Sequence, residues 1–377
     1  MTVKDEPKKK AQSGLLHFET HVLEDFCRDV FMACGLGREA ATQSAEVMVA
    51  ADVRGIPSHG IGRLWRYVNG LKSGLMRVDA KPEIVVDTPG ALVIDAHGGM
   101  GFPVSVQAMN RILEKAVSNG AAFGCVKDSN HFGIAGFYAM MALDHDMIGI
   151  ASTNTAALGL PTFGRQVMYG TNPLAFAAPA AAEKAFVLDM STTVVTRGKI
   201  EVCDRLHKPL PQGWAAGSDG RPISDAHTII DNLLNRLGGG IFPLGGEGED
   251  FGGYKGYGLA VMVDILCSVL CGATFGPQVS DTATSSARVS HFFGAIKIGA
   301  FRDPAEFRKD MDRMLRDLRL CPPAAGAERV YFAGQKEFEH EAKVRRHGVS
   351  LFQETVVSLE LISHETAVPL PEPLAAQ

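Results

Sequence analysis

The sequence predicts an α/β fold in which a mixed sheet follows a helical lobe at the N-terminal end. Two observations carry this prediction. Between residues 21 and 74, apolar side chains recur at helical spacing. After residue 85, short apolar runs typical of buried strands alternate with helical segments. With 377 residues and 46% hydrophobic content, the chain can bury a sizeable core in two or three lobes.

Three helices are expected in the N-terminal lobe, at residues 21–37, 38–55 and 59–74. Each ends at a glycine, which adopts the left-handed conformation that terminates helices without steric cost. We expect the third helix to begin at Ser58 and His59.

Beyond residue 85, strands and helices are expected to alternate. Proline near the start and glycine just past the end mark one helix clearly. The expected strands cover residues 91–99, 121–128, 147–155 and 185–193, and the expected helices cover 103–120, 134–146 and a long apolar segment from Leu259.

Four segments follow from this pattern. We expect a flexible arm at 1–16, a helical lobe with substrate-site residues at 17–85 and an α/β core at 86–330. The segment 331–377 would pack back on the core and fray at its end.

Composition excludes several classes of protein. A net charge of −5 leaves no broad basic face for nucleic acid. Seven scattered cysteines without a C-x-x-C pair argue against a disulfide framework and favour a reducing, cytoplasmic location. The charged start lacks the apolar stretch of a secretory signal. Asp264 interrupts the apolar run at 259–276, so we expect a buried helix there and no membrane span.

The stretch DVRGIPSHGIGRLWRY, residues 52–67, carries the first candidate site. On a helix, His59 and Arg63 would lie on one face, four residues apart. A guanidinium pairs with a carboxylate through two parallel hydrogen bonds, and a neighbouring histidine can move a proton. Ser58 would cap the helix or touch the ligand. The alternative is a surface helix with an ordinary cap and a solvated charge.

Two further segments place polar side chains where strands end. His131 lies in the loop SNHFG between a strand and a helix, where open α/β sheets bind ligands. Asp189 ends the apolar run VLDMSTT, and a histidine would be a natural partner for a carboxylate there. The alternatives are a structural histidine and a helix cap.

A glycine-rich stretch, GGYKGYG, precedes the apolar helix and suits a phosphate cradle. It is not a Walker A loop, because Gly256 follows Lys255 where serine or threonine is required. No strand leads into G-x-G-x-x-G, so the usual Rossmann fingerprint is missing. The alternative is a plain glycine-rich linker.

Taken in order, several of these segments resemble the type 2 malate/L-lactate dehydrogenase family over nearly the whole chain, from about His17 to Leu351. That family includes ureidoglycolate and sulfolactate dehydrogenases and cyclic-imine reductases such as piperideine-2-carboxylate reductase. The resemblance rests on ADVRGIPSHGIGRL, SNHFGIAGFYA, YGTNPLAFAAP, LDMSTT, PQGWA, PLGG and YKGYGLAVMVDILCSVLCGATFG.

The resemblance implies hydride transfer between NAD or NADP and a small 2-oxo or 2-hydroxy acid. It also implies a nucleotide-binding domain that is not a Rossmann fold, and a homodimer. By the same resemblance, the acid/base would be His131 with His59 and Asp189 beside it, and the substrate would contact Ser58, Arg63 and Thr155. The cofactor would contact Asp189, Met190, Ser191, Lys255, Gly256, Gly334, Gln335 and Lys336.

The chain departs from the family pattern in three places, one of which is the long linker at residues 231–253. The turn that usually reads Pro-Gly-Glu is here AGQKE, and the family's arginine near SSARVSHFFGAIKI is matched only by Arg288. These departures leave open the substrate and the choice between NAD and NADP, but not the reaction type. Which histidine carries the proton is also open from the sequence.

Three other functions remain open from the residues alone. One is an NAD(P)H-dependent reductase of a cyclic imine carboxylate, and another is a nucleotide-binding relative without turnover. The third is a metal-dependent hydrolase with His59, His131 and Asp189 as ligands. No H-x-H or H-E-x-x-H spacing supports that third function, so no metal is expected.

Overall fold

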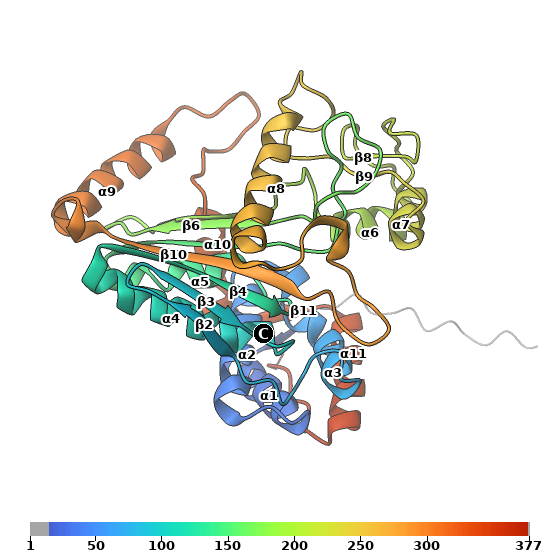
Figure 1. Ribbon diagram of the computed structural model, residues 1–377, viewed down its shortest axis with the longest axis horizontal. Coiled ribbons are helices and arrows are strands. Elements are labelled where there is room, and N and C mark those ends of the chain that lie inside the picture. Colours follow the sequence, from blue (N-terminus) through green and yellow to red (C-terminus); the bar gives the residue numbers. More distant parts are fainter. Residues whose placement is uncertain (1–14, 376–377) are drawn as a thin grey trace, which may run out of the picture.

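The computed structural model describes residues 15–375, so the arm expected at 1–16 lies almost wholly outside the described residues. Within that range, the centre of the molecule is a seven-stranded sheet (Figure 1). Its strands, in spatial order, are β2 (Glu83–Asp87), β3 (Ala91–Asp95), β4 (Ala121–Ser129), β10 (Val289–Lys297), β5 (Met147–Thr153), β6 (Leu174–Ala178) and β7 (Phe186–Met190). The pair β3–β4 is parallel and the other neighbours are antiparallel, which confirms the predicted mixed α/β fold.

The two faces of the sheet are covered unequally. On one face α4 (Gly101–Asn119) and α5 (Ala135–Met140) pack over the strands, and on the other lies α8 (Gly253–Cys267). Strand β4 shows the alternation that this requires, since Ala122 and Val126 join the core under α4 while Phe123 and Cys125 pack toward α8.

The sequence pattern predicted neither the central strand, β10, nor strands β2 and β6. Strand β10 comes more than 130 residues after β5 in the chain, yet it lies between β4 and β5 and runs antiparallel to both. The two neighbours therefore point the same way, and their carboxyl ends meet at one edge. Local periodicity cannot show this insertion, because the pairing is entirely non-local.

The helical lobe contains α1 (Thr20–Ala33), α2 (Arg38–Val53) and α3 (Leu64–Lys72). The C-terminal segment joins it. Strand β1 (Leu16–Phe18) pairs with β11 (Val349–Leu351), α10 (Gln335–His347) contacts α2, and α11 (Gln353–Thr366) contacts α1 and α3. The segment expected to pack back on the core does so at its start, where Ala333 O accepts a hydrogen bond from Val187 N at 3.0 Å. From α10 onward it packs on the helical lobe instead.

The residues between β7 and α8 form a smaller lobe with an apolar cluster of its own. It holds α6 (Arg197–Arg205), α7 (Ala226–Asn235), β8 (Ala215–Ala216) and β9 (Gly240–Ile241). Helix α9 (Pro304–Leu320) projects beside the sheet in Figure 1, anchored where Asp312 accepts hydrogen bonds from the backbone of residues 181–183. Single 3-10 turns are η1 (Pro57–His59), η2 (Ile61–Arg63), η3 (Leu143–His145), η4 (Val269–Cys271), η5 (Gly276–Gln278) and η6 (Ile298–Ala300).

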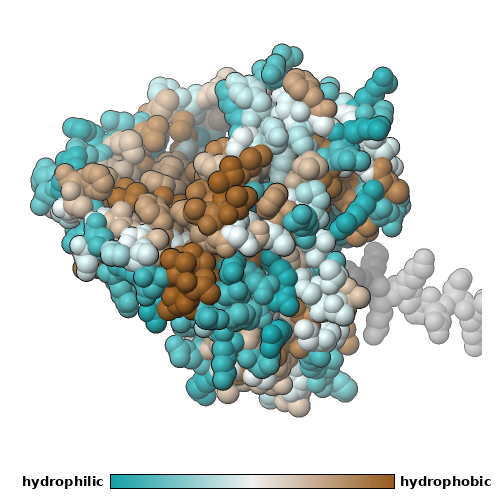
Figure 2. Space-filling view, viewed as in Figure 1, coloured by the Kyte–Doolittle hydropathy of each residue, from teal (hydrophilic) through white to brown (hydrophobic). Residues whose placement is uncertain are grey.

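The apolar helix is buried on one face only. Val263 and Cys267 are fully buried against the sheet, but Ile265 is 49% and Leu270 is 64% exposed. Among the described residues, the stretch Gly253–Cys271, which is α8 with the turn η4, is long and apolar enough to cross a membrane by length and composition, and 33% of its most apolar 18-residue segment is buried. Figure 2 shows hydrophobic side chains gathered on this side of the molecule around α8. The buried helix expected here is therefore buried only on the face that packs against the sheet.

Three element boundaries also differ from prediction. Helix α8 begins at Gly253, six residues early, so Lys255 lies in its first turn and not in a loop before it. The helix expected at 134–146 breaks after Met140. The helix expected to begin at Ser58 begins at Leu64, and two 3-10 turns precede it.

Gly60 explains the last difference. The buried carboxylate of Asp52 accepts a hydrogen bond from Ile61 N at 2.7 Å, and it occupies the space in which a Cβ on residue 60 would lie. Gly60 takes an extended conformation, with φ −90° and ψ −156°, so the helix stops there and restarts one residue later. The carboxylate thereby caps the new start.

We expect Gly60→Ala to lower the free energy of unfolding by about 1–3 kcal/mol, the usual cost of inserting a methyl group into packed surroundings. The matched control is Gly62→Ala, because its Cβ would be no closer than 3.7 Å to Thr355. Urea unfolding of both variants checks this, and equal stabilities would show that the Asp52 contact does not restrict residue 60.

Candidate active site

A pocket of about 390 Å³ lies where the helical lobe meets the sheet edge that carries the ends of β4 and β5. It brings together five of the side chains predicted to bind substrate or move a proton. They are Ser58, His59, Arg63, His131 and Thr155. The first three come from η1 and η2, and the other two from the loops after β4 and β5.

The loop that carries His131 is held from two sides. The amide of Asn130 donates hydrogen bonds to Gly98 O at 2.9 Å and Gly99 O at 2.8 Å. Phe132 stacks on the buried ring of His291, with centroids 4.4 Å apart. These contacts fix the backbone on both sides of His131, and sequence reasoning singled out none of the three residues.

His291 itself connects the two loops. Its Nδ1 lies 2.8 Å from Thr153 Oγ1 at the end of β5, and its Nε2 lies 2.9 Å from Ser129 Oγ at the end of β4. Burial lowers the pKa of His291 to about 3, so the ring stays neutral.

The ring of His131 has partners on both sides. Tyr67 places its hydroxyl 2.7 Å from Nδ1, and Gly133 N donates a weaker hydrogen bond to the same nitrogen at 3.3 Å. The ring of His59 stacks on His131 at 5.3 Å, with 24° between the planes. Tyr67 was missed from the sequence, although it follows Arg63 by one helical turn.

Both histidines are held uncharged in the free protein. Burial, with the nearby Arg63 guanidinium adding to it, lowers the pKa of His59 to about 4. Burial and then the charges of His59 and Arg63 lower the pKa of His131 well below its usual value. At neutral pH the pocket therefore carries its positive charge on arginine.

Arg63 differs from the other arginines of the pocket. Arg66 lies 3.8 Å from Asp281, Arg197 2.7 Å from Glu201, and Arg288 3.3 Å from Asp128. Among the described residues, no carboxylate lies within ion-pair distance of Arg63, whose Nε donates to Ser58 O. The guanidinium of Arg63 is thus the one in the pocket that is available to an anionic ligand. Arg288, which matches the position of the family's arginine, is already paired with Asp128.

Asp189 was expected to hold His131, and the structure contradicts this. Its Oδ2 accepts a hydrogen bond from Gly136 N, 2.7 Å away at the start of α5, and burial raises its pKa to about 6. Within residues 15–375, no hydrogen bond joins it to His131, because Tyr67 occupies the Nδ1 side of that ring.

The residues predicted to contact a cofactor fall into two groups. Asp189, Met190 and Ser191 lie at the end of β7, and the turn that contains Gly334, Gln335 and Lys336 packs beside the same strand. A Cβ on Gly334, which has φ +90°, would lie 2.9 Å from the Val187 side chain. Only glycine therefore fits at this position of the turn. The residues of this first group lie together, beside the end of β7.

Arg54 is a buried cation near Asp189, and its contacts indicate whether this surface suits a phosphate-bearing cofactor. Arg54 is 6% exposed, stacks on Phe338 at 4.7 Å, and has its nearest carboxylate, Glu341, at 3.8 Å. In the described part of the chain it makes no hydrogen bond within the usual limits. A guanidinium with open donors beside the end of β7 fits an anionic group there.

Lys255 and Gly256 form the second group and lie on α8. Lys255 is exposed, with its ammonium 5.7 Å from the ring of Tyr254. Gly256 has no room for a side chain because it packs against the backbone of Leu244, which bonds to Thr192 O at 2.9 Å. The glycine is explained by packing, and neither residue lines the pocket.

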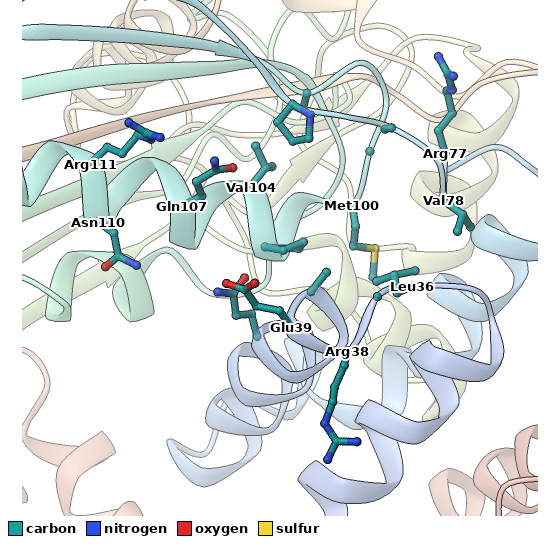
Figure 3. A pocket seen from close by; sticks show the side chains of 18 of the residues that line it. Leu36, Arg38, Glu39, Arg77, Val78, Met100, Val104, Gln107, Asn110 and Arg111 are labelled. Carbon is teal, nitrogen blue, oxygen red and sulfur yellow. The ribbon is translucent and has the colours of Figure 1, made fainter.

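A larger cavity than this pocket lies elsewhere. It has a volume of about 730 Å³ and is bounded by α2, α4 and the segment before β2. Figure 3 shows that Arg38, Arg77 and Arg111 point away from one another around it. No set of charges converges there, so the smaller pocket is the candidate site.

The described residues offer no cluster of three or more His, Cys, Asp and Glu side chains that could hold a metal ion. The ligand set considered from the sequence is also dispersed, because Asp189 bonds to Gly136 while the two histidines stack on each other.

The model of the malate/L-lactate dehydrogenase family matches residues 18–360. The chain belongs to this family.

Relatives span the chain almost completely. A malate dehydrogenase of Pyrococcus abyssi is 38% identical over 346 residues, which cover 92% of this chain and 94% of that protein. An L-sulfolactate dehydrogenase of Methanocaldococcus jannaschii is 35% identical, covering 91% and 95%. The crystal structure of malate dehydrogenase from Entamoeba histolytica superposes with a TM-score of 0.91 at 32% identity, covering 95% of this chain and all of that one.

The cofactors named among the relatives differ. A ureidoglycolate dehydrogenase of Escherichia coli (strain K12) carries NAD(+) in its name, and a (2R)-3-sulfolactate dehydrogenase of Chromohalobacter salexigens carries NADP(+). The family therefore uses nicotinamide cofactors of both kinds.

The lowered pKa of His59 predicts a pH-dependent stability. Because this pKa is about 4 in the folded protein and about 6.5 when unfolded, the unfolded chain binds more protons between these values. The contribution of the neutral His59 ring to the free energy of unfolding is therefore complete above pH 6.5 and is lost as the pH falls toward 4. We expect His59→Gln to flatten the fall in unfolding free energy by up to about 1.4 kcal/mol per pH unit.

Urea unfolding between pH 4.5 and 7 measures this slope. His364→Gln, an exposed position on α11, is the matched control and should keep the slope of the unmodified protein. A His59→Gln slope identical to that control would show that His59 takes up its proton equally in both states.

Proposed function

We propose that this protein is an NAD(P)-dependent dehydrogenase of small 2-hydroxy acids, of the malate type. The observation that carries the proposal is the free guanidinium of Arg63, which lies in one pocket with two uncharged histidines. Such a pocket suits a carboxylate next to an oxygen that gains or loses a proton. Relatives that are named malate dehydrogenases support the same substrate class.

The chain's own groups divide the work. Arg63 pairs with the substrate carboxylate, and Ser58 and Thr155 border the same space. His131 takes the hydroxyl proton during oxidation and returns it during reduction. His59, stacked on His131, polarises the oxygen or assists the carboxylate. The nicotinamide supplies or accepts the hydride when it is bound.

The cofactor would lie along the end of β7, on the residues from Asp189 to Ser191 and the turn at 334–336, with Arg54 toward its phosphates. Lys255 and Gly256 remain proposed contacts only by resemblance to the family. We infer a binding domain that is not a Rossmann fold, since the sequence has no G-x-G-x-x-G turn after a strand and the sheet has one parallel pair. The division at residues 17, 86 and 331, and a cytoplasmic location, are part of the same proposal. The seven free cysteines support that location.

We also propose a homodimer that covers the exposed face of α8. Val261 and Ile265 on α8, and Val269 and Leu270 on the following turn η4, are all at least 36% exposed. Exposed apolar surface of this kind marks interaction sites, and the family resemblance assigns a second copy of the chain. The helix belongs to a packed sheet layer, which favours a protein partner over a bilayer.

Arg63→Lys tests the proposed function, because lysine keeps the charge but lacks the planar fork. The unmodified protein should turn over a 2-oxo dicarboxylate with NADH or NADPH, and faster than pyruvate or a cyclic imine carboxylate. The variant should lose roughly 2–4 kcal/mol in kcat/KM, the scale of breaking a buried charged pair. Steady-state kinetics at fixed pH measures this.

The matched control is Arg77→Lys, an exposed arginine on the other cavity that is paired with Asp79. It should stay within threefold of the unmodified protein. A cyclic imine as the best substrate would replace the malate-type proposal with the imine reductase, and absence of turnover with every substrate would support a binding protein without activity.

Ile265→Glu tests the proposed dimer. A carboxylate on the covered face would be costly to bury, so the sedimentation coefficient should fall from that of a dimer to that of a monomer. Leu361→Glu, which is 58% exposed on α11 in the unmodified protein, is the control and should leave the dimer intact. A monomer before any substitution, or binding to lipid vesicles through α8, would contradict the proposal.

A further inference from the structure

We propose that Tyr67 is a positioning residue for His131, which holds its ring in one orientation through both of its protonation states. This inference rests on the proposed function, in which His131 moves the substrate proton. Neither the family resemblance stated from the sequence nor the comparisons assign a role to Tyr67.

The first argument comes from the two hydrogen bonds at Nδ1. A backbone N–H can only donate, so the contact from Gly133 requires an unprotonated Nδ1 in the resting ring. The Tyr67 hydroxyl then donates to the same nitrogen at 2.7 Å. A neutral imidazole with Nδ1 free of hydrogen carries its proton on Nε2, the other ring nitrogen.

The second argument comes from the chemistry of a hydroxyl. When His131 is protonated, Nδ1 also bears a hydrogen and needs an acceptor. Gly133 N cannot accept, but the Tyr67 oxygen can, after rotation of its O–H alone. Tyr67 therefore serves the neutral ring as a donor and the charged ring as an acceptor, and neither ring has to move.

The third argument concerns charge. The charged and titratable groups that influence His131 are His59 of η1, Arg63 of η2, Arg66 of α3 and His291 of β10, and all of them disfavour a cation. Full burial raises the pKa of Tyr67 to about 12, so the phenol remains neutral and offers no countercharge. The imidazolium then depends on the substrate anion for charge and on Tyr67 for its hydrogen bond.

The position of Tyr67 is itself fixed by packing. The side chain is fully buried, between Phe102 at 5.0 Å and Phe31 at 6.4 Å between ring centroids. Phenylalanine fits the same space, so Tyr67→Phe removes the hydroxyl and little else.

In Tyr67→Phe, the charged form of His131 loses its acceptor at Nδ1. We expect kcat for reduction to fall by roughly 10–100-fold, which is part of the 10²–10⁴ that a positioned acid/base contributes. The KM for the nicotinamide should change less than twofold. The pH at which reduction is half lost should move down by roughly one unit, because the pKa of His131 falls when only its neutral form keeps a partner.

Tyr138→Phe is the matched control. Its phenol is equally buried and donates a hydrogen bond to Phe132 O at 2.6 Å, in the same loop, but makes no hydrogen bond to His131. This variant should leave the midpoint of the pH profile in place. If Tyr67→Phe lowers the rate equally at every pH, with the midpoint unmoved, Tyr67 is only a packing residue and the inference is wrong.

A double variant separates this inference from the proposed function. If Tyr67 acts through His131, then Tyr67→Phe should cost little further activity in a His131→Asn background. Full multiplication of the two losses would overturn the inference alone. Unchanged turnover and pH profile in His131→Asn would overturn the role of His131 and the inference with it.

A measurement on the unmodified protein does not depend on variants. Selective ¹⁵N labelling of histidine distinguishes protonated from unprotonated ring nitrogens. His131 should show an unprotonated Nδ1 and a protonated Nε2 at neutral pH. A protonated Nδ1 in the resting protein would contradict the arrangement at Gly133 and Tyr67.

Discussion

The insertion of β10 between β4 and β5 is the constraint on which the site depends. Because β10 runs antiparallel to both neighbours, these point in one direction and end at one edge of the sheet. The loops after them carry His131 and Thr155. His291 on β10 bonds to the end of each neighbour and supports Phe132, so the central strand also fixes the distance between the two loops.

The second half of the pocket comes from a break in a helix. Asp52 occupies the space beside Gly60 and caps Ile61, which divides the predicted helix into turns. His59 and Arg63 still face one pocket, but on separate turns. The pocket is thus formed where a sheet edge meets an interrupted helix, and its shape depends on both the sheet and the helical lobe.

The charges in the pocket indicate which side chain can bind an anion and which can move a proton. Three arginines of the pocket have carboxylate partners, and both histidines are kept neutral by burial. The remaining cation, Arg63, and an uncharged imidazole form a site that is incomplete without an anion. Under the proposed function, the substrate carboxylate would pair with Arg63 and favour a proton on the histidine pair, which would couple binding to proton transfer.

The sequence by itself determined the helical lobe and four of the seven strands. It also determined five side chains that the pocket brings together, which are Ser58, His59, Arg63, His131 and Thr155. Those signals are local, because they depend on the periodicity of neighbouring residues and on short motifs. Only the tertiary structure decided that β10 is central, that Gly60 interrupts a helix, and that Tyr67 takes the place beside His131 expected for Asp189. Each of these follows from contacts between side chains or strands that no local pattern encodes. Tyr67 and His131 are 64 residues apart in the chain, and the bonds from His291 span 138 and 162 residues.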